Sequence, residues 1–136
     1  MSDSSPRALF AARLVQARQL RGLSQRALGD RMGLGKDKGS SRINRYEHQV
    51  TAIGFDNLGL LAQLLDVPVA YLLADNAAMA DAILALAQAD EPQRDALATL
   101  IPALVQDPAL LARLIKLLQL PKREQPKALK DLAGES

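Results

Sequence analysis

The sequence contains no cysteine and no tryptophan, and it has a single histidine, His48. Without cysteine there is neither a disulfide framework nor a thiolate metal ligand, and one histidine is too few for a histidine-based zinc site. We therefore expect no metal and no cofactor. Aromatic residues are also scarce, so leucine and alanine supply most of the apolar 49% of the composition. Both residues favour helices, which predicts an all-α protein.

Long hydrophobic runs are missing as well. Arginines at positions 7, 13, 18 and 21 interrupt the apolar stretch near the N-terminus, so it has no continuous hydrophobic region of the kind found in secretory signal peptides. No other segment approaches the length of a membrane span. We expect a soluble, intracellular protein with no membrane partner.

Acidic residues are few in the first third of the chain. Residues 1–50 hold ten Lys or Arg against four acidic residues, a net charge of +6. Residues 76–136 hold seven basic and eight acidic residues, a net charge of −1. The basic end of the protein is therefore expected to bind an anion.

Turn and capping residues divide the first 75 residues into five expected helices. Pro6 suits the first turn of a helix that Gly22 ends, and Ser24 suits the N-cap of a second helix that ends at Gly33. After a glycine-rich turn, apolar spacing indicates three more helices. The five are expected at about residues 6–21, 25–32, 39–49, 55–65 and 68–73, and the fourth has Phe55, Leu58, Leu61, Ala62 and Leu65 at the spacing of a core-facing stripe.

The third segment, Gly39 to Gln49 with the sequence GSSRINRYEHQ, is polar over most of its surface. Ile43 and Tyr46 share one helix face, so a thin apolar edge anchors this helix and Tyr46 is expected to pack in the core. The side chains largely away from that edge are Ser40, Ser41, Asn44 and Arg45. The preceding turn, GLGKDKG, lacks the Gly-x4-Gly-Lys-Ser/Thr spacing of a phosphate-binding loop and follows no strand, so nucleotide binding is not expected.

Two short helices joined by a turn, the second polar and basic outside, describe a helix-turn-helix. The pattern resembles the Cro/cI-type (XRE-like) phage repressor family over about residues 7–75. The matching features are Arg18, Gly22-Leu23-Ser24-Gln25, Leu28, Gly33, Ile43, Tyr46-Glu47 and LAQLLDVPVAYLL at 61–73. The resemblance implies a five-helix, lambda-repressor-like domain that binds double-stranded DNA. It also implies a cytoplasmic, nucleoid-associated protein that is bacterial or phage-encoded.

In that family the third helix lies in the DNA major groove. By position, the resemblance implies that Arg45 contacts guanine, that Asn44 contacts adenine and that Gln25 meets a phosphate. Arg18 and Glu47 match an ion pair that ties the first helix to the end of the third. The residues expected at the DNA are Gln25, Lys36, Lys38, Ser40, Ser41, Arg42, Asn44 and Arg45.

The sequence departs from the family pattern at two places. The stretch between Gly33 and Glu47 is longer than usual by about four residues, which changes where the third helix of the domain starts. Where the family usually ends that helix with glycine, this chain has His48-Gln49. We therefore expect the backbone amides that often bind phosphate there to be placed differently.

No catalytic constellation is evident. Many phage repressors carry a self-cleaving peptidase that uses a serine and a lysine, but after Ser41 the only serine of this chain is Ser136. Paired carboxylates and a Cys/His dyad are also missing. We expect no enzymatic activity.

From Asn76 onward the sequence becomes rich in alanine and leucine, with helices expected at about residues 77–89, 92–106 and 108–119. Pro102 is expected to kink or end the second of these helices. The leucines of the third form a band wider than one contact face needs, which favours a homodimer or higher oligomer. The alternative is that these helices fold back onto the N-terminal domain or each other. The residues expected at the oligomer interface are Leu111, Leu114, Ile115 and Leu118.

These observations predict three regions: a helix-turn-helix domain at 1–75, a helical oligomerisation region at 76–120 and a flexible tail at 121–136. The predicted function is sequence-specific regulation of transcription, most simply by a dimeric repressor on a palindromic operator with half-sites about 34–36 Å apart or a multiple of that distance. One alternative is the antitoxin of a toxin–antitoxin pair with autoregulatory DNA binding, whose C-terminal helices cover the toxin. Another is a protein-interaction scaffold without specific DNA binding.

Overall fold

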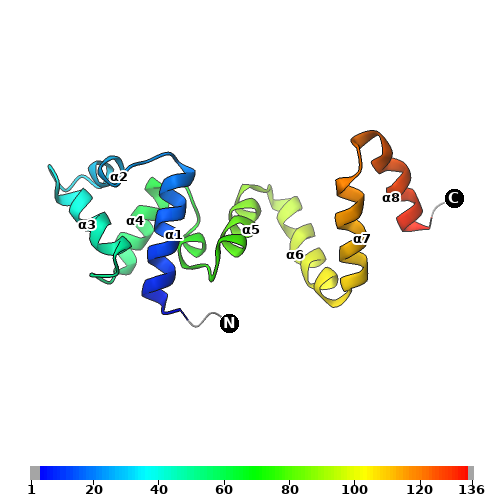
Figure 1. The fold of residues 1–136 in the computed structure, drawn as a ribbon, viewed down its shortest axis with the longest axis horizontal. Helices are drawn as coiled ribbons and strands as arrows, with labels where there is room; N and C mark the ends of the chain where they lie inside the picture. Colours follow the sequence, from blue (N-terminus) through cyan, green and yellow to red (C-terminus); the bar gives the residue numbers. More distant parts are fainter. Residues whose placement is uncertain (1–3, 135–136) are drawn as a thin grey trace. The chain divides into compact units, whose positions relative to one another are not determined.

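The computed structural model describes residues 4–134, and every regular element in that range is helical, which confirms the predicted all-α fold (Figure 1). Ser136 lies outside the described residues. The chain forms two compact units, residues 1–89 and 90–136. The elements of unit 1 are α1 (Pro6–Leu20), α2 (Gln25–Arg31), α3 (Lys38–Glu47), α4 (Phe55–Leu64), the 3-10 helix η1 (Val69–Leu73) and α5 (Ala77–Gln88). Those of unit 2 are α6 (Glu91–Gln106), α7 (Pro108–Gln119), η2 (Lys122–Glu124) and α8 (Gln125–Ala133).

Short polar side chains cap the N-termini of three helices of unit 1, namely α1, α2 and α5. The Ser5 hydroxyl oxygen accepts a hydrogen bond from the Ala8 amide at 3.2 Å, and Ser24 accepts one from the Ala27 amide at 2.9 Å. Asn76 caps α5 in the same way. Each cap satisfies a backbone donor that the helix leaves unpaired and contributes about 1 kcal/mol to stability.

One apolar core holds unit 1 together. Phe10 of α1 packs against Tyr46 of α3 in an edge-to-face arrangement with ring centroids 5.8 Å apart. Phe55, which the apolar spacing placed in the core, is instead 88% exposed because it is the first residue of α4 and lies beyond the packed part of that helix. The largest fully buried side chains are Leu14, Leu28, Ile43, Leu61, Leu65, Tyr71 and Leu72.

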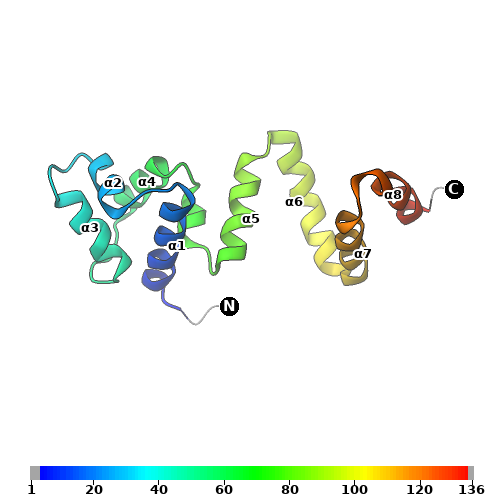
Figure 2. The same ribbon diagram turned by 45° about the horizontal axis from the view of Figure 1, so that its top comes forward.

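Two glycines bring α2 and α3 into direct backbone contact. Gly29 of α2 and Gly39 of α3 are both buried and face each other, and the two helices lie side by side (Figure 2). A methyl group on Gly39 would collide with the carbonyl oxygen of Gly29, and one on Gly29 would collide with the backbone at Ser40. Glycine at both positions is therefore what allows this close approach.

The helix α5 belongs to unit 1, so the structural boundary falls after residue 89 and not after residue 75 as expected. Ala80 is fully buried, and the Gln16 side chain donates a hydrogen bond to the Asp81 carboxylate at 3.1 Å, which joins α5 to α1. Burial raises the pKa of the Tyr71 hydroxyl beneath α5, and the negative charge of Asp81 raises it further. The Ala/Leu composition alone did not separate α5 from the helices that follow.

Unit 2 contains α6, α7, η2 and α8, and no side chain among residues 90–134 is buried. The helix α6 continues through Pro102 to Gln106. Proline removes only one backbone hydrogen bond here, and the carbonyl thereby freed, on Ala98, belongs to an exposed residue that water reaches. The expected flexible tail also differs from the structure, which has the helix α8 at Gln125–Ala133. The Gln125 side chain donates to the Leu120 carbonyl at 3.1 Å, and Gly134 ends α8 in the left-handed conformation.

Within the described residues, no single helix is both long and apolar enough to cross a membrane. The α6 and α7 helices reach that length only as a pair, and the chain bends by 116° between them.

Candidate nucleic-acid interface

The long turn before α3 contains three residues in the left-handed conformation. Gly33 and Gly35 have φ values of 72° and 93°, and Asp37, the residue before α3, has a φ of 65°. The Asp37 carboxylate forms an ion pair with Arg26 of α2 at 3.1 Å, although both side chains are more than half exposed. After this turn, α3 begins at Lys38 and still packs against α2.

Two adjoining hollows flank the exposed side of α3. One, of about 450 Å³, is lined by Gln25, Ser40, Ser41, Asn44 and Arg45. The other, of about 690 Å³, includes Lys36, Lys38, Ser41, Arg42 and Arg45 in its lining. Ser41 and Arg45 border both, so they form the ridge between them. The structure therefore brings all eight residues predicted at the DNA onto one surface.

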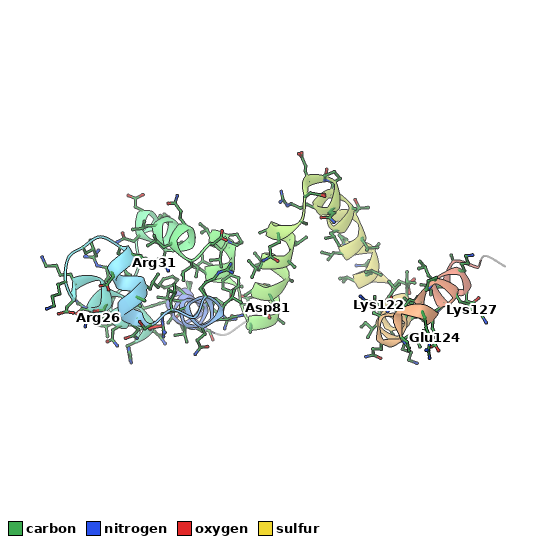
Figure 3. All side chains as sticks on the ribbon, turned by 90° about the horizontal axis from the view of Figure 1, so that it is seen from above. Arg26, Arg31, Asp81, Lys122, Glu124 and Lys127 are labelled. Atoms are coloured by element: carbon green, nitrogen blue, oxygen red, sulfur yellow. The ribbon has the colours of Figure 1, made fainter. Side chains whose placement is uncertain are left out.

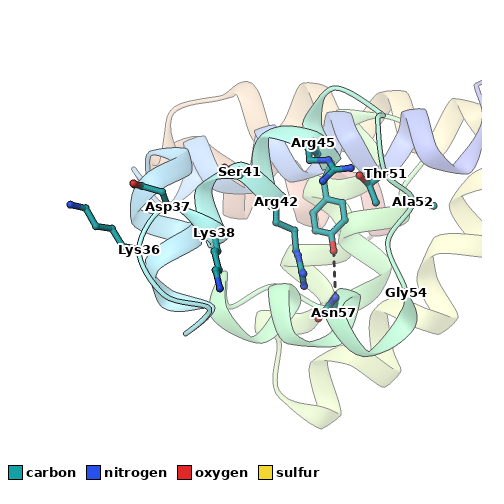
Figure 4. Close-up of a pocket in the computed structure, with 11 residues that line it drawn as sticks. Lys36, Asp37, Lys38, Ser41, Arg42, Arg45, Thr51, Ala52, Gly54 and Asn57 are labelled. Atoms are coloured by element: carbon teal, nitrogen blue, oxygen red, sulfur yellow. Dashed lines mark hydrogen bonds between the residues drawn. The ribbon is translucent and has the colours of Figure 1, made fainter.

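The larger hollow is strongly basic. Lys38, Arg42 and Arg45 all belong to α3 and line this hollow (Figure 4). Asp37 is the only acidic residue among the described residues that line this hollow, against four Lys or Arg. Such an excess of positive charge attracts an anion.

The far wall of this hollow consists of residues that the sequence-based prediction missed, namely Thr51, Ala52, Gly54 and Asn57. The Asn57 amide donates a hydrogen bond to the Tyr46 hydroxyl at 3.4 Å (Figure 4). Gly54 provides no side-chain cap for α4, so amides of the first turn of that helix remain available to a ligand. The sequence signal was the glycine directly before an apolar helical stripe, which marks a helix start.

An ion pair fixes the C-terminal end of α3 to α1. The Arg18 guanidinium lies 2.8 Å from the Glu47 carboxylate, and its Nε donates to the same carboxylate at 2.9 Å. The Glu47 side chain is only 3% exposed. Arg18 also donates to the Leu23 carbonyl at 3.0 Å, in the turn between α1 and α2. Three elements are thus joined at one buried carboxylate.

The Gln25 side chain is engaged within the protein. Its amide nitrogen donates to the Glu47 carboxylate, and its amide oxygen accepts from the Asn44 side chain at 3.3 Å. Since Glu47 can only accept, the nitrogen of Gln25 must face it and the oxygen must face Asn44. The ion pair therefore orients Gln25, and Gln25 in turn orients Asn44.

The end of α3 adopts a glycine-type geometry without glycine. Gln49 has a φ of 60°, and the Val50 amide donates to the Arg45 carbonyl at 2.9 Å, which closes a Schellman motif. The single histidine, His48, has its Nδ1 2.8 Å from the Asn44 carbonyl oxygen. No group of three His, Asp or Glu residues within 4–134 is arranged to hold a metal ion.

The comparisons with known proteins agree with this geometry. A family model described as helix-turn-helix matches residues 14–72. The crystal structure of the transcriptional regulator BswR superimposes with a TM-score of 0.62 at 30% sequence identity, covering 71% of this chain and 95% of that one. A search of curated protein sequences finds no match.

A helix-turn-helix that packs on one apolar core and exposes a basic third helix is the arrangement of a DNA-binding regulator. The chain belongs to the XRE-type helix-turn-helix family of transcriptional regulators, as its residue pattern indicated.

Proposed function

We propose that the protein is a dimeric repressor that recognises a palindromic operator in double-stranded DNA. The observation that supports this most directly is the exposed side of α3, where Ser40, Ser41, Asn44 and Arg45 border one hollow. The opposite side of α3 is held by the buried Ile43 and Tyr46, so the reading side chains project from a rigid support. A dimer on an operator blocks transcription by occupying the site that polymerase needs.

Base recognition is assigned to the ridge and the smaller hollow. Arg45 has the donor geometry for a bidentate contact with guanine, and Asn44 can pair with adenine by accepting and donating at once. The side-chain nitrogen of Asn44 donates one of its two hydrogens to the Gln25 side chain. Its second hydrogen and the side-chain oxygen of Asn44 remain for a base. Gln25 therefore acts by positioning Asn44, whereas the family resemblance implied that Gln25 contacts a phosphate.

Phosphate binding is assigned to the basic hollow. Lys36, Lys38 and Arg42 supply charge there, and the backbone amides at the start of α4 supply further donors. The logarithm of affinity falls linearly with the logarithm of salt concentration, and each phosphate neutralised on duplex DNA makes this slope steeper by about 0.9. Binding is therefore expected to weaken steeply as salt rises.

Dimerisation is assigned to α7. Leu111, Leu114, Ile115 and Leu118 border one apolar groove of unit 2, and Leu118 is 69% exposed. A two-fold dimer would place two copies of α3 on half-sites about 34–36 Å apart, or a multiple of it, and would bind far more tightly than one domain. Such a protein would act in the cytoplasm, on the nucleoid or on a phage genome.

The deciding experiment is selection of fragmented genomic DNA from the source organism by the purified full-length protein at near-physiological salt, followed by sequencing. An enriched inverted repeat is the expected result, and it would identify the operator. Retention without a motif would mean that the basic hollow binds phosphates while α3 reads no sequence. No retention would favour a protein-interaction scaffold. Enrichment of a site beside the protein's own gene, with a toxin gene adjoining it, would favour the antitoxin.

A further inference from the structure

The positive charge of unit 2 is concentrated in one stretch. Residues 113–131 hold six basic and two acidic residues, a net charge of +4, whereas residues 90–107 hold one basic and four acidic residues, a net charge of −3. Solubility needs no such separation, because interspersed charges of both signs also keep a surface soluble. Separated charges instead create a positive field at one part of the unit, which attracts an anion. The six cations, here called the basic surface, are Arg113, Lys116, Lys122, Arg123, Lys127 and Lys130.

The cations of the basic surface are not neutralised within the chain. All six side chains are exposed. The acidic residues of the same stretch are Glu124 and Asp131, yet no residue that the structure describes forms an ion pair with any of the six cations. Lys122 and Lys127 lie along η2 and α8 (Figure 3). The basic surface therefore keeps its full charge for an external anion.

Four of these cations form like-charged neighbours on their helices. Arg113 and Lys116 are three residues apart on α7, and Lys127 and Lys130 have the same spacing on α8. Residues at this spacing share a helix face, where like charges destabilise the helix. Binding of an anion relieves this repulsion, so the arrangement favours a partner with regularly repeated negative charge.

The basic surface is largely separate from the apolar groove assigned to dimerisation. Lys122 is its only member that lines the groove. Arg113 and Lys116 instead border a different hollow, of about 300 Å³, to which α8 contributes Asp131. A dimer formed through the groove does not need the other five cations.

We infer that the basic surface of unit 2 binds the phosphate backbone of duplex DNA outside the half-site contacted by α3. The chain belongs to a family of transcriptional regulators, and its covalent link holds unit 2 at a high effective concentration near any duplex that unit 1 has bound. Contacts to phosphate carry no sequence information, so this surface adds affinity without changing the base preference. The inference rests on the proposed function only in requiring that α3 lies on DNA, not in requiring a dimer or repression.

The test removes four of the cations and leaves the apolar groove intact. One full-length variant combines Arg113→Gln, Lys116→Gln, Lys127→Gln and Lys130→Gln, because none of these exposed residues lines the groove and glutamine favours helices about as well as lysine and arginine. The matched control keeps the charge at the same positions with Arg113→Lys, Lys116→Arg, Lys127→Arg and Lys130→Arg. Circular dichroism and sedimentation equilibrium verify that both variants keep the helix content and the mass of the unmodified protein.

Affinity for mixed-sequence duplex DNA is measured over a range of salt concentrations with two duplexes, one of about one helical turn and one of about four turns, at about 10–10.5 base pairs a turn. Unit 1 alone fills the short duplex. On the long duplex, the neutralised variant is expected to show a slope of log affinity against log salt that is less steep by about 2–4, because each phosphate contact contributes about 0.9. The control variant should match the unmodified protein on both duplexes, and the neutralised variant should match it on the short one.

An unchanged slope for the neutralised variant on the long duplex would overturn the inference. An equal loss of slope on both duplexes would also overturn it, because the lower net charge of the chain would then explain the effect. Vesicles of phosphatidylglycerol and phosphatidylcholine are the third probe: binding that the neutralised variant loses, with DNA binding unchanged, would assign the basic surface to an anionic membrane instead. Failure of the unmodified protein to bind the short duplex would overturn the proposed role of α3, and with it this inference, whereas a failure confined to the long duplex leaves the proposed function standing.

Discussion

At the scale of single residues, the exposed side of α3 is organised around the Glu47 carboxylate, whose side chain is only 3% exposed. Glu47 accepts from Arg18 and from Gln25, and Gln25 accepts from Asn44. Because an amide has one donating and one accepting end, this chain of hydrogen bonds sets which atoms Asn44 presents. A side chain oriented before binding loses less rotational freedom at the DNA.

Replacing Arg45 with alanine is expected to weaken operator binding by about 1–3 kcal/mol and to relax the base preference at one position. The reason is that the proposed bidentate contact with guanine disappears while the fold is unaffected, since Arg45 is exposed. Binding to a library of operator variants measures both effects. Arg31→Ala is the matched control, because Arg31 is also exposed but lines neither hollow. Unchanged affinity and preference would remove this assignment of Arg45.

Replacing Gln49 with glycine is expected to raise the free energy of unfolding by about 0.5–1 kcal/mol. A non-glycine residue in the left-handed region costs about 1–2 kcal/mol, and Gln49→Gly removes this cost. Glycine loses more conformational freedom on folding, which offsets about 0.5–1 kcal/mol of the stabilisation. Urea unfolding followed by circular dichroism measures the change. Gln63→Gly, within α4, should instead destabilise the protein by a similar amount. A loss of stability in Gln49→Gly would contradict the strained geometry.

At the scale of helices, the contact between α2 and α3 explains how the long turn is tolerated. Residues added to a surface turn cost little as long as the helices that it connects still pack together. Here Gly29 and Gly39 let the two backbones touch, and Ile43 and Leu28 continue the contact into the core. The turn can therefore lengthen without displacing α3.

Replacing Gly39 with alanine is expected to destabilise the protein by about 1–3 kcal/mol and to reduce operator affinity. The added methyl group meets the rigid backbone of Gly29, so α3 must shift away from α2. Thermal unfolding and a DNA-binding titration measure the two effects. Gly59→Ala is the control, because Gly59 is helical and its added methyl group would meet nothing within 4 Å. Equal behaviour of the two variants would argue against the glycine contact.

At the scale of the whole molecule, the proposed function assigns DNA reading to unit 1 and assembly to unit 2. Unit 1 has a core and the helix-turn-helix, whereas unit 2 has exposed apolar helices. Linking two DNA-binding units raises the effective concentration of the second at its half-site. Affinity for a full operator should therefore depend on unit 2, although unit 2 touches no base in this proposal.

Replacing both Leu114 and Leu118 with aspartate is expected to produce a monomer by sedimentation equilibrium. Two carboxylates in the groove would have to be buried without partners, which is strongly unfavourable. Affinity for the full operator should fall by a factor of about 10²–10⁴ while binding to a single half-site stays the same. Val105→Asp, outside the groove, should leave both measurements unchanged. An unaltered mass for the double variant would refute this interface.

The sequence by itself determined the family and every α-helix before α8, because capping residues, apolar spacing and the helix-turn-helix pattern are local signals. It further predicted which residues of α3 read DNA. It also placed Arg18 and Glu47 as a pair through the family resemblance. Only the tertiary structure decided that α5 joins unit 1, that Phe55 is exposed and that Gln25 holds Asn44. These depend on which faces meet, and an Ala/Leu-rich helix does not specify its neighbour. The helix α8 was missed because its short apolar stripe is stabilised by contacts with α7 that no local pattern reveals.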